Sequence, residues 1–273
     1  MRRSFIDDLN MQTMQDSVFY YSGASTLTKP ELAALDSLVD VNGKPVLDIG
    51  IGGGRTVEAL RNISNDYVGI DYVAEMVEEC KRKFPGVRFE QCDARKLSFA
   101  DNTFQVVLFS MNGISMVDHE GRLEILKEVF RVLRPGGYFL FSTYNRDFPG
   151  YQDLFRMSDF IRMSEFSFSL NPLKFYHANK YPIYNLLVSL RNRFRFRKME
   201  VHASEYSIVN DRCHNYATML YYITRSNQFK QLKSVGFGEN ILTFDANGDV
   251  FTEATPFDSI FYLARKPEHS PQN

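Results

Sequence analysis

The chain has 273 residues, a hydrophobic fraction of 44%, a charged fraction of 24% and a formal net charge of −1. Both fractions are average for a globular protein, so disorder, collagen and a coiled coil are excluded. A charge so close to zero also argues against a nucleic-acid backbone as the main partner, because such proteins carry a strongly basic surface. The length suits one sizeable domain, alone or with a cap.

The cysteines and the start of the chain bear on its location. Cys80, Cys92 and Cys213 are far apart and form no CxxC pair, which excludes a disulfide framework and a structural zinc site and suits a reducing compartment. The first residues have no apolar core of the signal-peptide kind. No apolar run approaches the ~18 residues of a membrane-spanning helix. We therefore expect a cytoplasmic protein with no metal site and no transmembrane segment.

Residues 1–43 predict a helical N-terminal lid. Thr28 with Glu31 three residues later is a capping box, and with Pro30 in the first turn it predicts a helix that runs through Leu38. An aromatic cluster precedes this helix. We interpret its Tyr20 and Tyr21 as lid residues, although ordinary helix packing explains them equally well.

Residues 44–145 alternate short apolar runs with amphipathic stretches. Alternation of this kind predicts a parallel sheet with helices on both faces, so the expected fold class is α/β. The helix expected at 120–133 is stopped by Gly136 and Gly137. The apolar runs predict strands at 45–49, 67–71, 87–91, 104–109 and 138–142.

After residue 145 the composition changes. Residues 146–224 hold 16 of the 39 aromatic residues, carry a net charge of +4 and show no strand–helix rhythm. They predict an α+β cap inserted after the fifth strand, with the main domain resuming over 225–266. Within residues 225–266 we expect a helix at 226–235, followed by two strands at 239–244 and 259–264 that pair antiparallel.

A glycine-rich turn after the first strand carries the sharpest functional signal. Residues 48–54 are Asp-Ile-Gly-Ile-Gly-Gly-Gly, and a helix is expected directly after them. Glycines permit a tight turn on which a ligand can lie against bare main chain, and the helix start adds N–H donors. The dinucleotide pattern G-x-G-x-x-G fails, because Arg55 replaces the third glycine counted from Gly50. Asp48 would repel a pyrophosphate but suits a ligand with an ammonium group.

Two further acids follow the next strands. Asp71 ends the second strand, where it can accept both hydrogen bonds from a ribose diol. Asp93 follows the third strand and can accept the exocyclic amine of an adenine. The three acids together indicate a nucleoside cofactor rather than a dinucleotide.

At these residues the sequence resembles the class I S-adenosylmethionine-dependent methyltransferases of the bacterial small-molecule type. The resemblance implies a seven-stranded, mostly parallel sheet with helices on both faces and an antiparallel last strand. It also implies methyl transfer from S-adenosylmethionine, with S-adenosylhomocysteine as the product. The motifs that carry it are the glycine loop (46–55), the acids at 69–71 and 92–94, and the lead-in to the fifth strand (132–137).

The resemblance assigns cofactor roles by position. Gly50 and Gly52 would approach the methionine part, Asp48 would lie near its ammonium, and Asp71 would hold the ribose. Ser110, Met111 and Asn112, after the fourth strand, would flank the sulfonium. The other cofactor-binding residues expected are Tyr21, Gly54, Tyr72, Met76, Asp93 and Ala94.

The methyl sulfonium is already a strong electrophile, so placement and exclusion of water are the main demands on the protein. A base is needed only when the acceptor must lose a proton. We expect His214 in that catalytic role, with Asp211 and Tyr216 beside it, because they are close in sequence and the cap should face the methyl group. A purely structural role remains the commoner one for a lone histidine.

Acceptor contacts are expected in the cap. Residues 191–198 alternate arginine with other residues at period two, which as a strand would place Arg193 and Arg195 on one face. These arginines, with His177 and Asn112, are the expected substrate-binding residues. The basic strand would grip an anionic group or an anionic membrane surface. A solvated edge strand protected by its charge explains the same pattern.

The expected function is methyl transfer to oxygen or nitrogen of a small molecule, such as a sugar, a polysaccharide precursor or a natural-product intermediate. The alternatives are an RNA or protein methyltransferase and a non-catalytic regulatory protein that binds S-adenosylmethionine. A DNA partner is not expected, because residues 110–114 lack the Pro-Pro-aromatic pattern of amino-methylating enzymes. A homodimer stays open.

Overall fold

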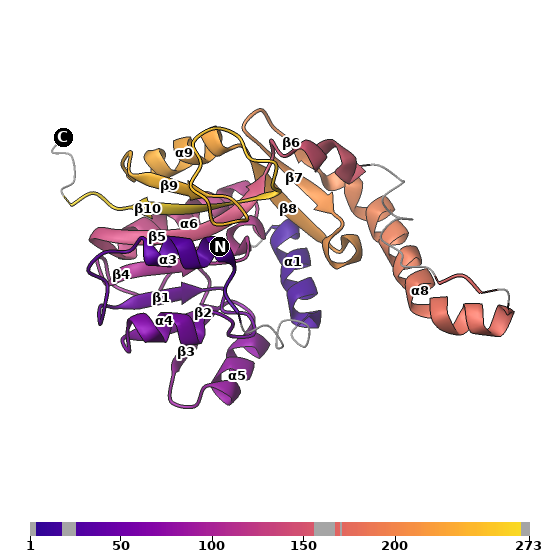
Figure 1. Ribbon diagram of the computed structural model, residues 1–273, viewed down its shortest axis with the longest axis horizontal. Coiled ribbons are helices and arrows are strands. Elements are labelled where there is room, and N and C mark those ends of the chain that lie inside the picture. Colours follow the sequence, from indigo (N-terminus) through magenta and orange to yellow (C-terminus); the bar gives the residue numbers. More distant parts are fainter. Residues whose placement is uncertain (1–3, 18–25, 156–166, 170, 269–273) are drawn as a thin grey trace.

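The computed structural model describes residues 4–17, 26–155, 167–169 and 171–268. A single mixed sheet crosses the molecule, helices cover its faces, and one long helix leaves the body on the side of the cap (Figure 1). Tyr20 and Tyr21, predicted as lid residues, lie outside the described residues. The α/β fold class is confirmed.

The centre of the sheet is parallel and has the order β3-β2-β1-β4-β5. β10 pairs antiparallel with β5, and β9 pairs antiparallel with β10, so the predicted C-terminal strand pair is confirmed. These seven strands are the predicted set. Their bounds are β1 Val46–Ile49, β2 Tyr67–Asp71, β3 Arg88–Gln91, β4 Phe104–Phe109, β5 Leu133–Asn145, β9 Ile241–Phe244 and β10 Ser259–Arg265.

Capping residues in the sequence mark the start of several helices. The Thr28–Glu31 capping box forms as predicted at the start of α3, and Asp118 caps α6 by accepting from the Gly121 N–H. The helices are α1 Phe5–Asp16, α3 Lys29–Asp36, α4 Val57–Ile63, α5 Ala74–Lys83, α6 His119–Val132, α8 Pro172–Phe196 and α9 Arg225–Ser234. Short 3-10 turns lie at η1 Gly113–Ser115, η2 Pro149–Phe155, η3 Arg197–Met199 and η4 Cys213–Tyr216.

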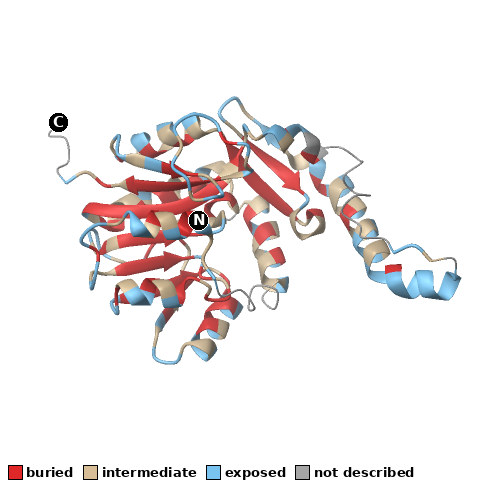
Figure 2. Cartoon of the chain, viewed as in Figure 1, coloured by how far each residue is buried: buried red, intermediate tan, exposed pale blue. Residues whose placement is uncertain are grey.

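Alternate residues of the central strands enter two apolar cores, one on each face of the sheet. Along β1, Leu47 and Ile49 belong to the core that α6 and α9 cover, while Val46 belongs to the core under α3, α4 and α5. β1 and β2 are buried along their whole length, as Figure 2 shows. Asp48 therefore points into the second core and has to find its partners there.

The sheet has ten strands rather than seven, because β5 is longer than predicted. It begins directly after α6 at Leu133 and extends to Asn145. Its last two residues pair with β8 on the side where β4 has already ended. β8 Thr218–Ile223 pairs antiparallel with β7 Tyr206–Asp211, which pairs with β6 Val201–His202. The cap strands thus continue the sheet past the carboxyl end of β4.

The predicted strand at 191–198 is wrong. Most of it is the last part of α8, and the rest is the 3-10 turn that follows. Successive helix positions are about 100° apart, so Arg193 and Arg195 do not share a face. The Arg/Phe alternation hid a helical pattern of three- and four-residue steps that begins far upstream at Leu173.

Asn10 of the N-terminal helix α1 bonds this helix to strand β8 and to the turn after β4. Asn10, which is fully buried, donates from Nδ2 to the carbonyls of Met116 (2.7 Å) and Met219 (2.8 Å). Its Oδ1 accepts the N–H of Met219 at 2.9 Å. The same residue thus completes the hydrogen bonding of β8 and of the turn after β4.

Replacing Asn10 by alanine should lower the free energy of unfolding by roughly 3 kcal/mol, because buried main-chain groups would lose their partners. Gln12→Ala, an exposed change on the same helix, should stay within about 0.5 kcal/mol of the wild type. Urea unfolding followed by circular dichroism measures both. Equal stabilities of the two variants would contradict this role of Asn10.

Candidate functional site

The glycine loop joins β1 to α4 at the carboxyl edge of the sheet. Gly50, Gly52 and Gly54 all have positive φ angles, of +67°, +51° and +84°. A Cβ on Gly50 or Gly54 would lie 2.8 Å from Phe109 or 2.5 Å from Phe84, so these two glycines are required for packing. A Cβ on Gly52 would meet no heavy atom within 4 Å. The main chain at Gly52 is therefore open to a ligand.

Asp71, at the end of β2, holds this loop in place. Its Oδ2 accepts the Gly52 N–H at 3.0 Å, and its Oδ1 accepts the Val73 N–H at 2.9 Å. Burial raises the pKa of Asp71 to about 6, so the carboxylate remains ionised at neutral pH. A carboxylate has about four lone-pair sites, so Asp71 keeps acceptor capacity for a ribose hydroxyl beyond its main-chain donors.

Asp48, at the end of β1, lies under the loop and is 1% exposed. Its Oδ2 accepts from the hydroxyls of Thr56 and of Tyr67, the latter at 2.9 Å. Burial raises the pKa of Asp48 to about 7. The predicted role of Asp48 near an ammonium group stays a prediction, and in this geometry it would act through its charge rather than by direct contact.

A buried ion pair that the sequence did not reveal lies beside the loop. Glu31 of α3 is 1% exposed and accepts from the Arg55 guanidinium (2.7 Å from Nη1), from the hydroxyl of Ser110 and from the Thr28 N–H. Burial alone would raise the pKa of Glu31, but Arg55 and the other donors outweigh it and hold that pKa below its ordinary value. The cluster joins the N-terminal segment, the loop and the end of β4.

The residues after β4 have a strained backbone. Met111 and Asn112 have φ angles of +47° and +57°, which non-glycine residues seldom adopt and which are often found at ligand sites. Asn112 is held by the Ser142 hydroxyl, which accepts its N–H at 2.8 Å, and by Ser259. Its buried Oδ1 has no hydrogen-bond partner among the described residues, and Met111 is 57% exposed. This turn is open for contact at the predicted sulfonium position.

The residues predicted at the adenine differ in exposure. Asp93 forms an ion pair with Arg95 (2.6 Å), which also binds Asp7 of α1, so the third acid fastens α1 to the domain. Met76 is 2% exposed, so its side chain packs inside the domain. The other two residues, Tyr72 and Ala94, are half-buried and buried. Their contacts with a purine stay predictions.

The predicted base and its two companions lie around the η4 turn. His214 Nδ1 is 3.4 Å from the Ser17 hydroxyl, and burial lowers the pKa of His214, so the ring is neutral at pH 7 and able to accept a proton. Asp211 accepts from the Tyr222 hydroxyl and the Cys213 N–H rather than from the imidazole. Tyr216 is 1% exposed. The catalytic role of this group stays a prediction.

Three of the four residues predicted to bind the acceptor lie on α8, and they are not grouped together there. Arg193 forms an ion pair with Glu200 and donates to the Asn210 carbonyl at 3.2 Å. Arg195 is exposed, with its guanidinium 5.0 Å from the Phe196 ring centroid. His177 is exposed in the outer half of the helix. Of the four predicted residues, Asn112 alone lies at the carboxyl edge of the central sheet.

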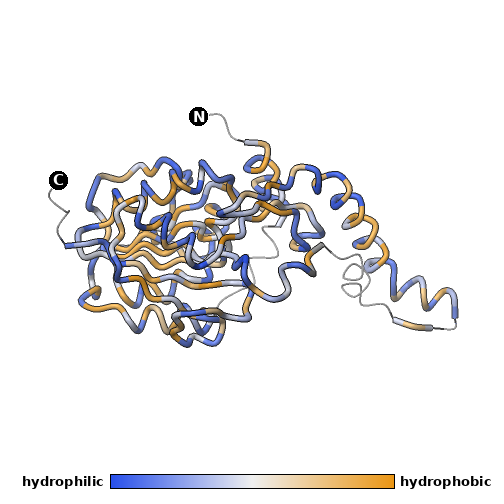
Figure 3. The backbone as a smooth tube through the Cα atoms, turned by 90° about the horizontal axis from the view of Figure 1, so that it is seen from above, coloured by the Kyte–Doolittle hydropathy of each residue, from blue (hydrophilic) through white to orange (hydrophobic). Residues whose placement is uncertain are grey.

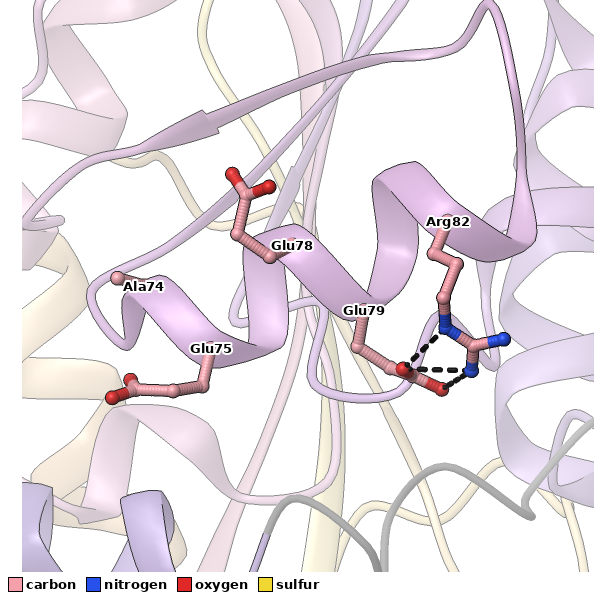
Figure 4. Close-up of a pocket in the computed structure, with 5 residues that line it drawn as sticks. All are labelled: Ala74, Glu75, Glu78, Glu79 and Arg82. Atoms are coloured by element: carbon pink, nitrogen blue, oxygen red, sulfur yellow. Dashed lines mark hydrogen bonds and ion pairs between the residues drawn. The ribbon is translucent and has the colours of Figure 1, made fainter.

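Figure 4 shows a different hollow, on the side of α5, lined by Ala74, Glu75, Glu78, Glu79 and Arg82. One helix supplies all of these residues, and Glu79 is paired with Arg82 at 2.7 Å. The hollow includes neither the glycine loop nor Asp71, so it is no part of this site.

Known proteins resemble this chain over part of its length. A family model described as "Methyltransferase domain" matches residues 46–137. The chain is 39% identical over 103 residues to a ubiquinone/menaquinone biosynthesis C-methyltransferase from Desulfotalea psychrophila, covering 36% of this chain and 40% of that protein. It is 34% identical over 141 residues to a fatty-acid O-methyltransferase from Mycolicibacterium smegmatis, covering 50% and 44%. The chain thus spans less than half the length of these two relatives.

Residues 46–137 are a class I S-adenosylmethionine-dependent methyltransferase domain. The fold agrees with that of a solved 1,6-didemethyltoxoflavin-N1-methyltransferase from Burkholderia thailandensis with bound S-adenosylhomocysteine. That match has a TM-score of 0.56 at 12% identity and covers 95% of this chain and 88% of the other. The predicted family and cofactor are confirmed for this methyltransferase domain. The open main chain at Gly52, with ionised Asp71 behind it, fits the cofactor.

Gly52→Ala should abolish binding of S-adenosylhomocysteine, because the new methyl group fills the open side of the loop. The positive φ should also lower stability by about 1–2 kcal/mol. Gly43→Ala is the matched control, since Gly43 has a φ of +71° and equally open surroundings but lies before β1, at the opposite edge of the sheet. Isothermal titration calorimetry and urea unfolding measure both effects. Equal ligand affinities of the two variants would contradict the assignment of Gly52 to the cofactor site.

The free energy of unfolding should fall as pH rises from about 4 to about 7. The folded state holds protons on Asp48 and Asp71 up to pKa values of about 7 and 6, whereas the unfolded chain releases them near 3.8. In Asp48→Asn the decrease in the free energy of unfolding between pH 5 and pH 8 should be smaller by on the order of 2 kcal/mol. The exposed change Asp66→Asn should leave the profile unaltered. Parallel profiles for wild type and Asp48→Asn would refute the buried-charge assignment.

Proposed function

We propose that the protein transfers a methyl group from S-adenosylmethionine to a small-molecule acceptor with an apolar body. The open main chain at Gly52, next to the ionised carboxylate of Asp71, carries the proposal. It is supported by the methyltransferase domain in which both residues lie. Oxygen and nitrogen remain the expected accepting atoms, and carbon joins them because one relative is a C-methyltransferase.

The cofactor would supply an electrophilic methyl group, and the residues of the chain would place it. Gly50 and Gly52 would offer main chain to the methionine part, and Asp71 would accept from the ribose. The turn at Met111 and Asn112 would border the sulfonium. The ionised form of Asp48, whose pKa burial raises to about 7, would favour a cationic ligand from beneath the loop.

Glu31 and Arg55 would have a positioning role. They neutralise each other, and their contact with Ser110 fixes the end of β4 relative to the loop. Bond-forming reactions depend steeply on such placement. A base would be required only for a protonated acceptor, and neutral His214 is the candidate for that role.

The acceptor side would be the cap at 146–224, with residues 1–43 as the lid. The cap strands continue the sheet past the end of β4, which brings them to the edge where the methyl group would lie. Beneath them is an aromatic cluster whose members are Tyr144, Phe148, Tyr151 and Tyr222. This aromatic cluster, together with a quinone and a fatty acid in the names of two relatives, favours an apolar acceptor over a sugar.

Methyl-labelled S-adenosylmethionine, incubated with the protein and separate lipid and aqueous extracts, should yield label in a small molecule of the lipid extract. Asp71→Asn should reduce the transfer at least about tenfold, since the ribose loses a charged acceptor. Asp66→Asn should leave it unchanged. Mass spectrometry of the products and thermal unfolding of each variant provide the measurement and its check.

Label in the aqueous extract alone would contradict the proposal of an apolar acceptor but would still support methyl transfer. Label in RNA or protein would assign a macromolecular acceptor instead. Binding of the cofactor without turnover in any fraction would identify a non-catalytic binding protein and overturn the proposal.

A further inference from the structure

Helix α8 carries one continuous exposed stripe along its length. Its members follow each other in steps of three or four residues, which places them on one side of a helix. Every one of them is exposed, and the five apolar members each expose 60–70% of their surface. They are Leu173, Tyr176, Lys180, Tyr184, Leu187, Arg191 and Phe194.

The charged residues of this helix and of the 3-10 turn after it are all basic. Residues 171–199 contain seven of the 32 Lys and Arg residues of the chain and none of its 33 Asp and Glu residues. The remaining residues, with 25 basic and 33 acidic side chains, carry a net charge of −8. Lys180 and Arg191 lie within the apolar stripe itself. Charge and exposed apolar surface therefore coincide on a single element.

The helix leaves the body of the protein, as the two views of Figures 1 and 3 show. All residues from 171 to 178 are exposed, and Figure 2 shows this outer end in pale blue. At the inner end of the helix, Asn192 donates to the Asn215 carbonyl at 2.9 Å, and Phe196 is buried. At 1.5 Å per residue, 25 residues span about 37 Å. The stripe can thus reach a surface that the acidic body does not touch.

We propose that the stripe of α8 docks the protein on an anionic lipid bilayer. Tyrosine, phenylalanine and leucine together with lysine and arginine are the side chains that settle at a membrane–water interface. Long basic side chains can bury their stems there and keep their charges at the headgroups. Within the described residues no helix is long and apolar enough to cross a membrane, so the helix would lie along the surface.

Charge decides between this occupant and two others. A second copy of α8 would bring two strongly positive helices together, and like charges repel. RNA would match the charge but offers no apolar phase for Leu173 and Leu187, whereas a bilayer satisfies both properties at once. Docking does not depend on methyl transfer, so either proposal can fail alone.

The test is flotation of the full chain with vesicles of phosphatidylcholine and phosphatidylglycerol. Binding should be strong to these vesicles, weak to pure phosphatidylcholine, and reduced by high salt. Lys180→Glu with Arg191→Glu should weaken binding at least about tenfold. Lys127→Glu with Lys230→Glu is the matched control: it changes the net charge equally, on the exposed sides of α6 and α9, and should alter binding less than threefold.

The apolar part is tested by Tyr184→Gln with Leu187→Gln, which should also weaken binding at least about tenfold while thermal unfolding stays unchanged. Failure of the wild type to float with anionic vesicles would overturn the proposal. Equal loss in the control and the α8 variants would do the same. Binding of single-stranded RNA without vesicle binding, or a dimer that the α8 changes dissociate without vesicle binding, would assign the stripe to the other occupants.

Discussion

The hydrogen bond from the Gly52 N–H to Asp71 joins the ends of two parallel strands and sets the path of the glycine loop. Because Asp71 takes that main-chain donor, the loop turns its other side outward, where a Cβ on Gly52 would meet nothing. Gly50 and Gly54 press instead on Phe109 and Phe84. Two glycines thus serve packing and one leaves a surface for the ligand, although all three look alike in the sequence.

The acids around this loop differ in what neutralises them. Glu31 has Arg55 as a close cation, so its carboxylate stays ionised in spite of burial. Among the described residues, the hydrogen-bond donors to Asp48 and Asp71 are hydroxyls and main-chain N–H groups, and burial raises the pKa of both. Two buried acids that no ion pair neutralises within the described part of the chain lower the stability of the free protein. They also create a negative potential that a ligand with positive charge relieves.

Local sequence patterns predicted much of the fold but few of the hydrogen bonds and ion pairs of the site. Strand runs, the capping box at Thr28 and the glycine loop depend on neighbours in sequence, and all of them formed. Glu31 bonds to Arg55, 24 positions later in the sequence, and to Ser110, 79 positions later. Contacts between residues so far apart cannot be predicted from local spacing. Asp211 bonds to Tyr222 across a strand pair rather than to His214 beside it. The strand expected at 191–198 failed because a two-residue repeat and a helical stripe overlap there.

The central claim is that the carboxyl ends of β1 and β2 cradle the cofactor. A crystal structure of the protein with S-adenosylhomocysteine tests it most directly. We expect the ligand against the main chain of Gly50 and Gly52, with its ribose hydroxyls donating to Asp71. A ligand bound elsewhere, or one that leaves Asp71 bonded to main-chain N–H groups alone, would contradict this placement.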